Sequence, residues 1–337
     1  MRQRKIIVIG GSAGSIEPLK TLVAHLPPTL PAALFVVVHL SADSPGLLSD
    51  ILRQSSKLPV LTAEDQMPIR LGHIYVAPPD HHLLLETGWM RVTHGPKENR
   101  FRPAVDPLFR SAAYAFDQEV IGVVVSGMLD DGTAGLWAIK DRGGIAMVQE
   151  PAEALYASMP MNALRYVTVD YRLPIAEMAA QLETLVHEPL VEEGELPMSD
   201  HLAIETKIAL EDNALKGGIL HLGKPSLFTC PECHGVLVQI EEGEIVRYRC
   251  HTGHAYSQEA LLSEVDESVE IGLWNAVRTM DESILLLRQL ADQVSSEGED
   301  ERAQRFRQKA DDVEQKSQYV REFALNHNGK KAMTGEA

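Results

Sequence analysis

The chain has 337 residues, of which 45% are hydrophobic and 23% are charged, as expected for a folded globular protein with more than one unit. Its formal net charge of −17 argues against a nucleic-acid partner, because phosphate contacts need clustered lysine and arginine. No apolar run approaches the roughly 20 residues that span a bilayer, and the apolar run after Lys5 is too short for a signal peptide. We therefore expect a cytoplasmic protein without membrane insertion.

Short β-branched runs alternate with amphipathic stretches from residue 5 to about residue 185, which predicts an α/β fold with a mostly parallel, doubly wound sheet. The predicted strands are Lys5–Ile9, Leu34–His39, Val60–Thr62, His73–Ala77, Val120–Ser126, Ile145–Val148 and Tyr166–Val169. The predicted helices are Ile16–His25, Pro45–Gln54, Pro103–Ala115 and Gly132–Arg142. The segments His82–Glu86 and Met90–Thr93 predict an antiparallel hairpin.

The second half of the chain has a different composition. Nine acidic residues accompany two lysines from Glu183 to Lys216, which predicts an acidic, solvated linker with a short helix over residues 188–226. Apolar residues recur at helical spacing after the cysteines, and a break at 295–298 predicts a helical hairpin over residues 257–326. This hairpin also offers a surface for a homodimer. We expect residues 327–337 to form a disordered tail.

The stretch Gly10–Gly14 lies between the first predicted strand and the first predicted helix. A glycine-rich phosphate loop and a Gly-x-Ser-x-Gly nucleophile elbow both have this layout. Ser12 and Ser15 stand where the dinucleotide fingerprint needs glycine, and no Gly-Lys-Ser/Thr follows, so nucleotide binding is disfavoured. The elbow pattern fits, with Ser12 as its nucleophile; a tight turn with a solvated serine is the structural alternative.

A nucleophilic serine needs a base and an orienting carboxylate. In parallel α/β sheets the site lies beyond the carboxyl ends of the strands, and His39 and Asp131 both stand where predicted strands end. A histidine bonded to a neighbouring carbonyl and an aspartate that caps the next helix are the alternatives.

Five stretches in this order resemble the chemotaxis protein-glutamate methylesterase (CheB-type) family over residues 4–185. They are Ile9–Gly14, Val36–His39, Ala77–Leu83, Asn99–Ala113 and Val123–Leu136. The resemblance implies a three-layer α/β/α catalytic domain over residues 1–187 that needs no cofactor for catalysis. It implies hydrolysis of γ-glutamyl methyl esters on the cytoplasmic helices of methylated chemoreceptors, often with deamidation of receptor glutamines.

The resemblance also implies a role for individual residues. Ser12 would be the nucleophile, His39 the base and Asp131 the orienting carboxylate, while Ala13 and Met128 would shape the oxyanion site. We expect Asp130 to cap the following helix or to be exposed.

The chain departs from receptor-coupled members at several positions. Ala13 replaces their usual threonine and Leu129 replaces a glycine. Because Ser12 is near the start of the sequence, we expect a stand-alone branch without a preceding receiver domain. A catalytically weak signalling scaffold, which binds partners through its C-terminal modules, is the alternative function.

All three cysteines belong to one motif, C-x2-C, sixteen residues and C-x3-H, which is close to zinc-ribbon spacing at the ends of a short hairpin. His234 and His251 each adjoin a cysteine, and neighbouring side chains on an extended chain point to opposite faces, so His254 is the expected fourth ligand. The predicted module spans residues 227–256, and its alternative is three buried cysteines without metal. We expect loss of the metal to leave esterase activity largely intact. The predicted ligands of a structural Zn²⁺ are Cys230, Cys233, Cys250 and His254.

Overall fold

The computed structural model describes residues 3–190, 200–211 and 214–334. The chain divides into two compact units, Met1–Leu261 and Leu262–Ala337, and each has its own internal packing. In the described part of the chain, no helix combines the length and the apolar character needed to cross a membrane.

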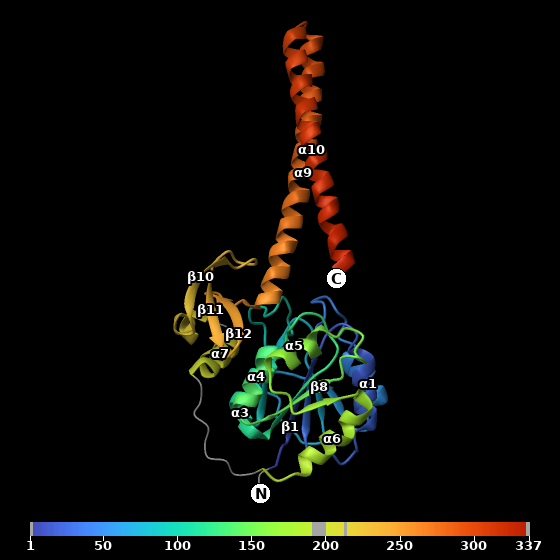
Figure 1. Cartoon of the computed structure of the whole chain (residues 1–337), viewed down its shortest axis with the longest axis vertical. Coiled ribbons are helices and arrows are strands. Elements are labelled where there is room, and N and C mark those ends of the chain that lie inside the picture. Colours follow the sequence, from blue (N-terminus) through green and yellow to red (C-terminus); the bar gives the residue numbers. More distant parts are fainter. Residues whose placement is uncertain (1–2, 191–199, 212–213, 335–337) are drawn as a thin grey trace. The chain divides into compact units, whose positions relative to one another are not determined.

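A seven-stranded parallel sheet forms the centre of the first unit, with the order β3-β4-β2-β1-β7-β8-β9 (Figure 1). Its strands are β1 (Ile6–Gly11), β2 (Ala33–Val38), β3 (Val60–Thr62), β4 (Ile74–Val76), β7 (Val120–Val124), β8 (Ile145–Gln149) and β9 (Tyr171–Leu173). Strands β2, β3 and β4 lie on one side of β1, and β7, β8 and β9 lie on the other side. The carboxyl ends of β1, β2 and β7 therefore meet at a switch point, where open α/β sheets place their sites.

Helices cover both faces of this sheet because its strands are apolar on both sides. Ile6 and Val8 of β1 pack into one hydrophobic core, and Ile7 and Ile9 pack into the other. The first core is closed by α3 (Val105–Phe116), α4 (Thr133–Asp141) and α5 (Ser158–Tyr166). The second core is closed by α1 (Ile16–His25), α2 (Leu48–Ser55) and α6 (Ile175–His187). The predicted three-layer α/β/α fold is confirmed.

Most predicted elements match the observed ones, including α1 and the hairpin of β5 (His82–Glu86) and β6 (Trp89–Thr93). The strand predicted at Tyr166–Val169 is wrong, because Tyr166 ends α5 and the strand lies later, at β9. The β-branched residues of that stretch indicated a strand, but β propensity mainly reports side-chain packing. Val167 buries its side chain in the hydrophobic core although it lies in a loop and not in a strand.

The rest of the first unit contains α7 (Asp200–Glu211), α8 (Ala214–Gly217) and a four-stranded antiparallel sheet. This sheet consists of β10 (Lys224–Thr229), β11 (Val236–Glu242), β12 (Ile245–Cys250) and β13 (Ala255–Ser257), in that order. We call β10–β13 and their turns the Cys/His module. It contains the predicted hairpin, extended by one strand on each side.

The expectation of a solvated linker is wrong for α7, whereas residues 191–199 of that linker lie outside the described part. Leu202, Glu205 and Ile208 of α7 are buried. The acidic composition indicated solvation, but Glu205 forms ion pairs with buried arginines of α3 and β12, which sequence alone does not place beside it.

The second unit is an antiparallel helical hairpin formed by most of α9 (Gln258–Ser296) and by α10 (Asp300–Thr334) (Figure 1). Ile284, Leu287 and Ala310 form its apolar contact. The disordered tail expected from residue 327 is not observed up to Thr334, because α10 continues to that residue. The homodimer through these helices stays a prediction.

Candidate active site

Ser12 lies in the turn that joins β1 to α1. Its amide donates to the Ser126 carbonyl at 2.9 Å, and its own carbonyl accepts from the Ser15 hydroxyl at 2.6 Å, which fixes the turn. A side chain at Gly10 would place a Cβ 2.1 Å from a methyl carbon of Val105, so only glycine fits there. This is the close approach that a nucleophile elbow requires.

His39 follows β2, the strand beside β1. Gly11 pairs with Val38 in the parallel ladder, so Ser12 and His39 are the next residues along two neighbouring strands. Neighbouring strands lie about 4.8 Å apart, which brings the two residues to the same edge of the sheet. The His39 ring stacks on Phe101, with ring centroids 3.8 Å apart and an interplanar angle of 11°. This stacking fixes the ring plane.

Asp131 lies in the loop after β7 and binds the imidazole directly. The distance from His39 Nε2 to Asp131 Oδ2 is 2.6 Å, and both side chains are at most 4% exposed. The other ring nitrogen, Nδ1, is buried and has no hydrogen-bond partner among the described residues. With Asp131 on Nε2, Nδ1 is the nitrogen left to take a proton.

The Asp131 carboxylate accepts four further hydrogen bonds. They come from Asn99 Nδ2 at 2.9 Å and from the amides of Val105 at 2.6 Å, Asp106 at 3.2 Å and Gly132 at 3.0 Å. Burial is the largest influence on this group and acts to raise its pKa, but the bond to His39 and the other donors lower the pKa of Asp131 to about 2. The carboxylate is therefore charged at neutral pH.

Asp130 does not occupy either of the positions expected for it. Helix α4 is preceded by Gly132 without a side-chain cap, and Asp130 is partly buried, with its Oδ1 accepting from the Ser257 hydroxyl at 2.5 Å. Burial raises the pKa of Asp130 to about 7. The preceding residue, Leu129, has φ +58°, a conformation that favours glycine.

The Ala13 and Met128 amides belong to the two residues predicted to shape an oxyanion site. Within the described ranges, neither the Ala13 amide nor the Met128 amide donates to a protein acceptor. A Cβ at Gly127 would lie 2.0 Å from the Met159 sulfur and 3.0 Å from Ser12 Cβ, so this glycine lets the Met128 loop approach the serine.

The sequence prediction missed Asn99, which binds Asp131, and Phe101, which stacks on His39. Asn99 has φ +49°, which asparagine tolerates better than most residues, and its side chain is buried beside Asp131. Both residues lie inside the longest stretch of the family resemblance, which is the signal that could have found them.

Comparisons with known proteins identify the family of the domain that contains these residues. The family model described as CheB methylesterase matches residues 7–182. The chain belongs to the CheB methylesterase family. The predicted enzyme class is thereby confirmed, and Ser12, His39 and Asp131 all lie within the matched residues.

Individual relatives agree with the family match. A curated relative from Leptospira interrogans, named for protein-glutamate methylesterase/protein-glutamine glutaminase activity, is 38% identical over 174 residues, which cover 51% of this chain and 90% of the relative. One from Anaeromyxobacter dehalogenans is 36% identical over 181 residues, 54% of this chain but only 53% of the relative. The crystal structure of the Thermotoga maritima CheB methylesterase catalytic domain matches with a TM-score of 0.53 and 32% identity, covering 55% of this chain and all of that one.

The Cys/His module lies outside the family match and contains a cluster of possible metal ligands. The ligand atoms of Cys230, Cys233, Cys250 and His254 all lie within 4.8 Å of one another. Cys233 Sγ is 3.6 Å from Cys250 Sγ, and His254 Nδ1 is 3.6 Å from Cys230 Sγ and 3.5 Å from Cys250 Sγ. His251 is exposed.

These separations can be compared with a tetrahedral zinc site. Bonds of about 2.3 Å to sulfur and about 2.0–2.1 Å to nitrogen place two sulfurs about 3.8 Å apart and a sulfur and a nitrogen about 3.6 Å apart. His254 Nε2 lies 3.2 Å from a Glu232 carboxylate oxygen, the outer partner that a metal-binding histidine usually has. The four residues fit a zinc ion.

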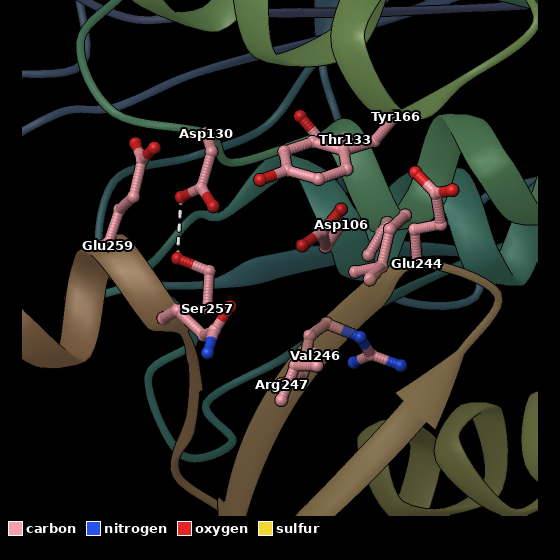
Figure 2. Close-up of a pocket in the computed structure, with 12 residues that line it drawn as sticks. Asp106, Asp130, Thr133, Tyr166, Glu244, Val246, Arg247, Ser257 and Glu259 are labelled. Carbon is pink, nitrogen blue, oxygen red and sulfur yellow. Dashed lines mark hydrogen bonds between the residues drawn. The ribbon is translucent and has the colours of Figure 1, made fainter.

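A cavity of about 200 Å³ lies between the catalytic domain and the Cys/His module. Figure 2 shows Asp106, Asp130 and Thr133 on one side, with Ser257 and Glu259 on the other. Neither Ser12 nor His39 lines it. It is therefore a feature of the contact with the module rather than the place where an ester would react.

Proposed function

We propose that this CheB-family chain hydrolyses γ-glutamyl methyl esters on methyl-accepting receptor proteins, with Ser12, His39 and Asp131 as its catalytic triad. The observation that carries the proposal is the His39 ring, held by Asp131 at Nε2 and unbonded at Nδ1, beside an elbow serine in the next strand. The activity named for its relatives supports the choice of ester.

The first half of the reaction forms an acyl-enzyme. Ser12 Oγ attacks the ester carbonyl carbon while His39 Nδ1 accepts the serine proton, and charge develops on the carbonyl oxygen. The amides of Ala13 and Met128 would donate to that oxygen; one such donor typically contributes about 3–4 kcal/mol. The C–O bond to the methoxy group then breaks, and His39 returns the proton, so that methanol leaves.

The second half regenerates the serine. Water attacks the acyl carbon as His39 Nδ1 takes its proton, the bond to Ser12 Oγ breaks, and the proton passes to the serine. The product is a glutamate side chain. A receptor glutamine would follow the same course with ammonia as the leaving group, which accounts for the second activity named for the relatives.

Methanol release from receptor membranes with radiolabelled methyl esters tests the proposal. We expect the full chain to release labelled methanol and Ser12→Ala to slow release by about 10⁴- to 10⁶-fold. Ser41→Ala, an exposed serine after β2, is the matched control and should keep the wild-type rate. Equal rates for wild type and Ser12→Ala would instead support the scaffold alternative.

We further propose that Cys230, Cys233, Cys250 and His254 hold one structural Zn²⁺. Four protein ligands leave no open position, so the ion would stabilise the module and take no part in ester hydrolysis. Elemental mass spectrometry of protein purified without chelators should find one zinc per chain. His254→Ala should lose the zinc, while His251→Ala should retain it. Zinc-free wild-type protein, or the reverse ranking of the two variants, would refute this assignment.

A further inference from the structure

We propose that Asn99 is a positioning residue through which the Cys/His module holds the catalytic carboxylate of Asp131. The proposal rests on the triad proposed above and concerns how that triad is regulated. It assigns a role to the part of the chain that lies outside the family match.

The Asn99 side chain is 5% exposed and joins the two parts of the unit. Its Nδ2 donates to Asp131 Oδ1 at 2.9 Å and to Asp106 Oδ2 at 3.0 Å. Its Oδ1 accepts from the Ser257 amide at 2.8 Å, and its backbone amide donates to the Ala255 carbonyl at 2.8 Å. Both Nδ2 protons therefore serve carboxylates of the catalytic domain, while the other two groups are bonded to β13.

Strand β13 is closely tied to the metal-ligand cluster. Ala255 directly follows His254, whose carbonyl accepts from the Cys250 amide at 2.9 Å. The Tyr256 hydroxyl lies 3.5 Å from Cys230 Sγ. The backbone atoms that bind Asn99 are therefore only a few covalent bonds from a ligand of the cluster, so we expect a structural change in the cluster to displace them.

Ser257 makes a second contact with the catalytic loop. Its hydroxyl bonds Asp130, the neighbour of Asp131, as Figure 2 shows. The module thus approaches the loop after β7 at Asp130 directly and at Asp131 through Asn99.

Buried ion pairs fix this contact in place. Glu98, the neighbour of Asn99, binds Arg249 of β12 at 2.6 Å and also pairs with Arg110 of α3. Glu205 of α7 pairs with Arg247 at 2.6 Å and with Arg249 at 3.1 Å. All these side chains are at most 4% exposed. Removing one partner of such a pair would leave its counterpart buried without a compensating charge, so these pairs fix the geometry of the contact.

Asn99 bridges two carboxylates by donating a hydrogen bond to each of them. Asp106 and Asp131 accept from the same amide group, so without it two buried acids face each other with one donor fewer each. Asp131 Oδ2, which binds His39, would then shift with the rest of the carboxylate. This opposes the expectation from sequence that the module and the esterase are independent.

The experiment compares variants of the full chain in the methanol-release assay across pH. Asn99→Gly removes the side chain and tolerates the positive φ. We expect it to lower kcat by about 10- to 100-fold, the range seen when the hydrogen-bond partner of a metal ligand is removed, with KM changed less than about twofold. Asn99→Asp adds negative charge beside the Asp131–His39 pair, which favours the protonated imidazole. The acid limb of the profile, which is the fall in kcat as the pH is lowered, should therefore move to higher pH.

Asn162→Ala is the matched control. Asn162 also connects the loop after β7 to the segment that follows the module: its Nδ2 donates to the Leu129 carbonyl and to Glu259 in the first turn of α9, but it does not touch Asp131. We expect kcat within about threefold of wild type and an unmoved acid limb. If Asn162→Ala moves the limb as Asn99→Asp does, or if Asn99→Gly keeps kcat within threefold of wild type, the positioning role is refuted.

His254→Ala tests the link to the module. It should lower kcat in the wild-type background but add less than about threefold in Asn99→Gly, because both changes act through one contact. Hydrogen exchange of residues 98–106 should increase in both single variants. Additive losses, or unchanged exchange in His254→Ala, would overturn the link. An inactive wild-type chain would refute the proposed function instead, and the exchange result would still decide the contact between module and Asn99.

Discussion

Asp131→Asn is the change whose outcome the site geometry defines most sharply. Oδ1 of the native carboxylate accepts from three donors, namely Asn99 Nδ2 and the amides of Asp106 and Gly132. Oδ2 accepts from His39 Nε2 and the Val105 amide. An asparagine has only one acceptor oxygen, so its NH2 group must replace one of these oxygens and face its donors.

The cheaper orientation puts the NH2 group at the Oδ2 position, because this opposes one fixed N–H instead of three. His39 must then accept at Nε2 and carry its proton on Nδ1, so the nitrogen that should take the serine proton is blocked. Loss of the correct tautomer in this way costs about 10⁴ in kcat. The opposed Val105 amide adds about 1–3 kcal/mol of destabilisation, less than the loss of a core side chain.

The assay is methanol release at saturating substrate, with chemical denaturation in parallel to show that the variant is folded. Asp130→Asn is the control: Asp130 does not contact His39, and we expect a loss of tenfold at most. A folded Asp131→Asn variant within tenfold of wild type, or one that loses less activity than Asp130→Asn, would refute the assignment of the orienting carboxylate.

Two further predictions concern stability. In denaturant titrations, Glu205→Gln should lower the free energy of unfolding by about 3–5 kcal/mol, because it leaves the buried arginines with one negatively charged partner fewer. The control is Glu241→Gln at an exposed position, which should change the free energy of unfolding by less than about 0.5 kcal/mol. The pKa of Asp130 is raised to about 7, so its contribution to stability falls as pH rises from about 4 to about 7. Asp130→Asn should therefore melt at a higher temperature than wild type at pH 8, with the difference vanishing near pH 4; a constant difference would contradict the shift.

The sequence predicted the central sheet well because its strands are apolar on both faces and are separated by clear turns. It predicted that Ser12, His39 and Asp131 lie at one edge of the sheet, because each follows a strand and parallel strands bring their carboxyl ends to one edge. Asp131 could be preferred to Asp130 only through the family resemblance. The structure supplies the physical reason: the loop turns one carboxylate toward His39 and the other toward Ser257.

Long-range ion pairs were beyond reach from the sequence. Glu205 stands in an acidic stretch that indicated solvent, and nothing nearby in the chain reveals that arginines of β12 and α3 surround it. The docking of the Cys/His module escaped prediction for the same reason. The grouping of its three cysteines with His254, by contrast, was predicted, because the spacing typical of metal ligands can be read from the chain.

Asp106, Asp130 and Asp131 lie close together near the switch point, but their pKa values differ. Asp131 has five donors and a pKa lowered to about 2, whereas burial and the charge of Asp131 raise the pKa of Asp106 to about 8, and burial raises that of Asp130 to about 7. Three ionised carboxylates this close would repel one another strongly in a buried site. Concentrating the donors on Asp131 leaves it as the one full negative charge of the three, directly beside the His39 ring. Because Asn99 is one of those donors and is held by β13, the module outside the family match contributes to that charge distribution.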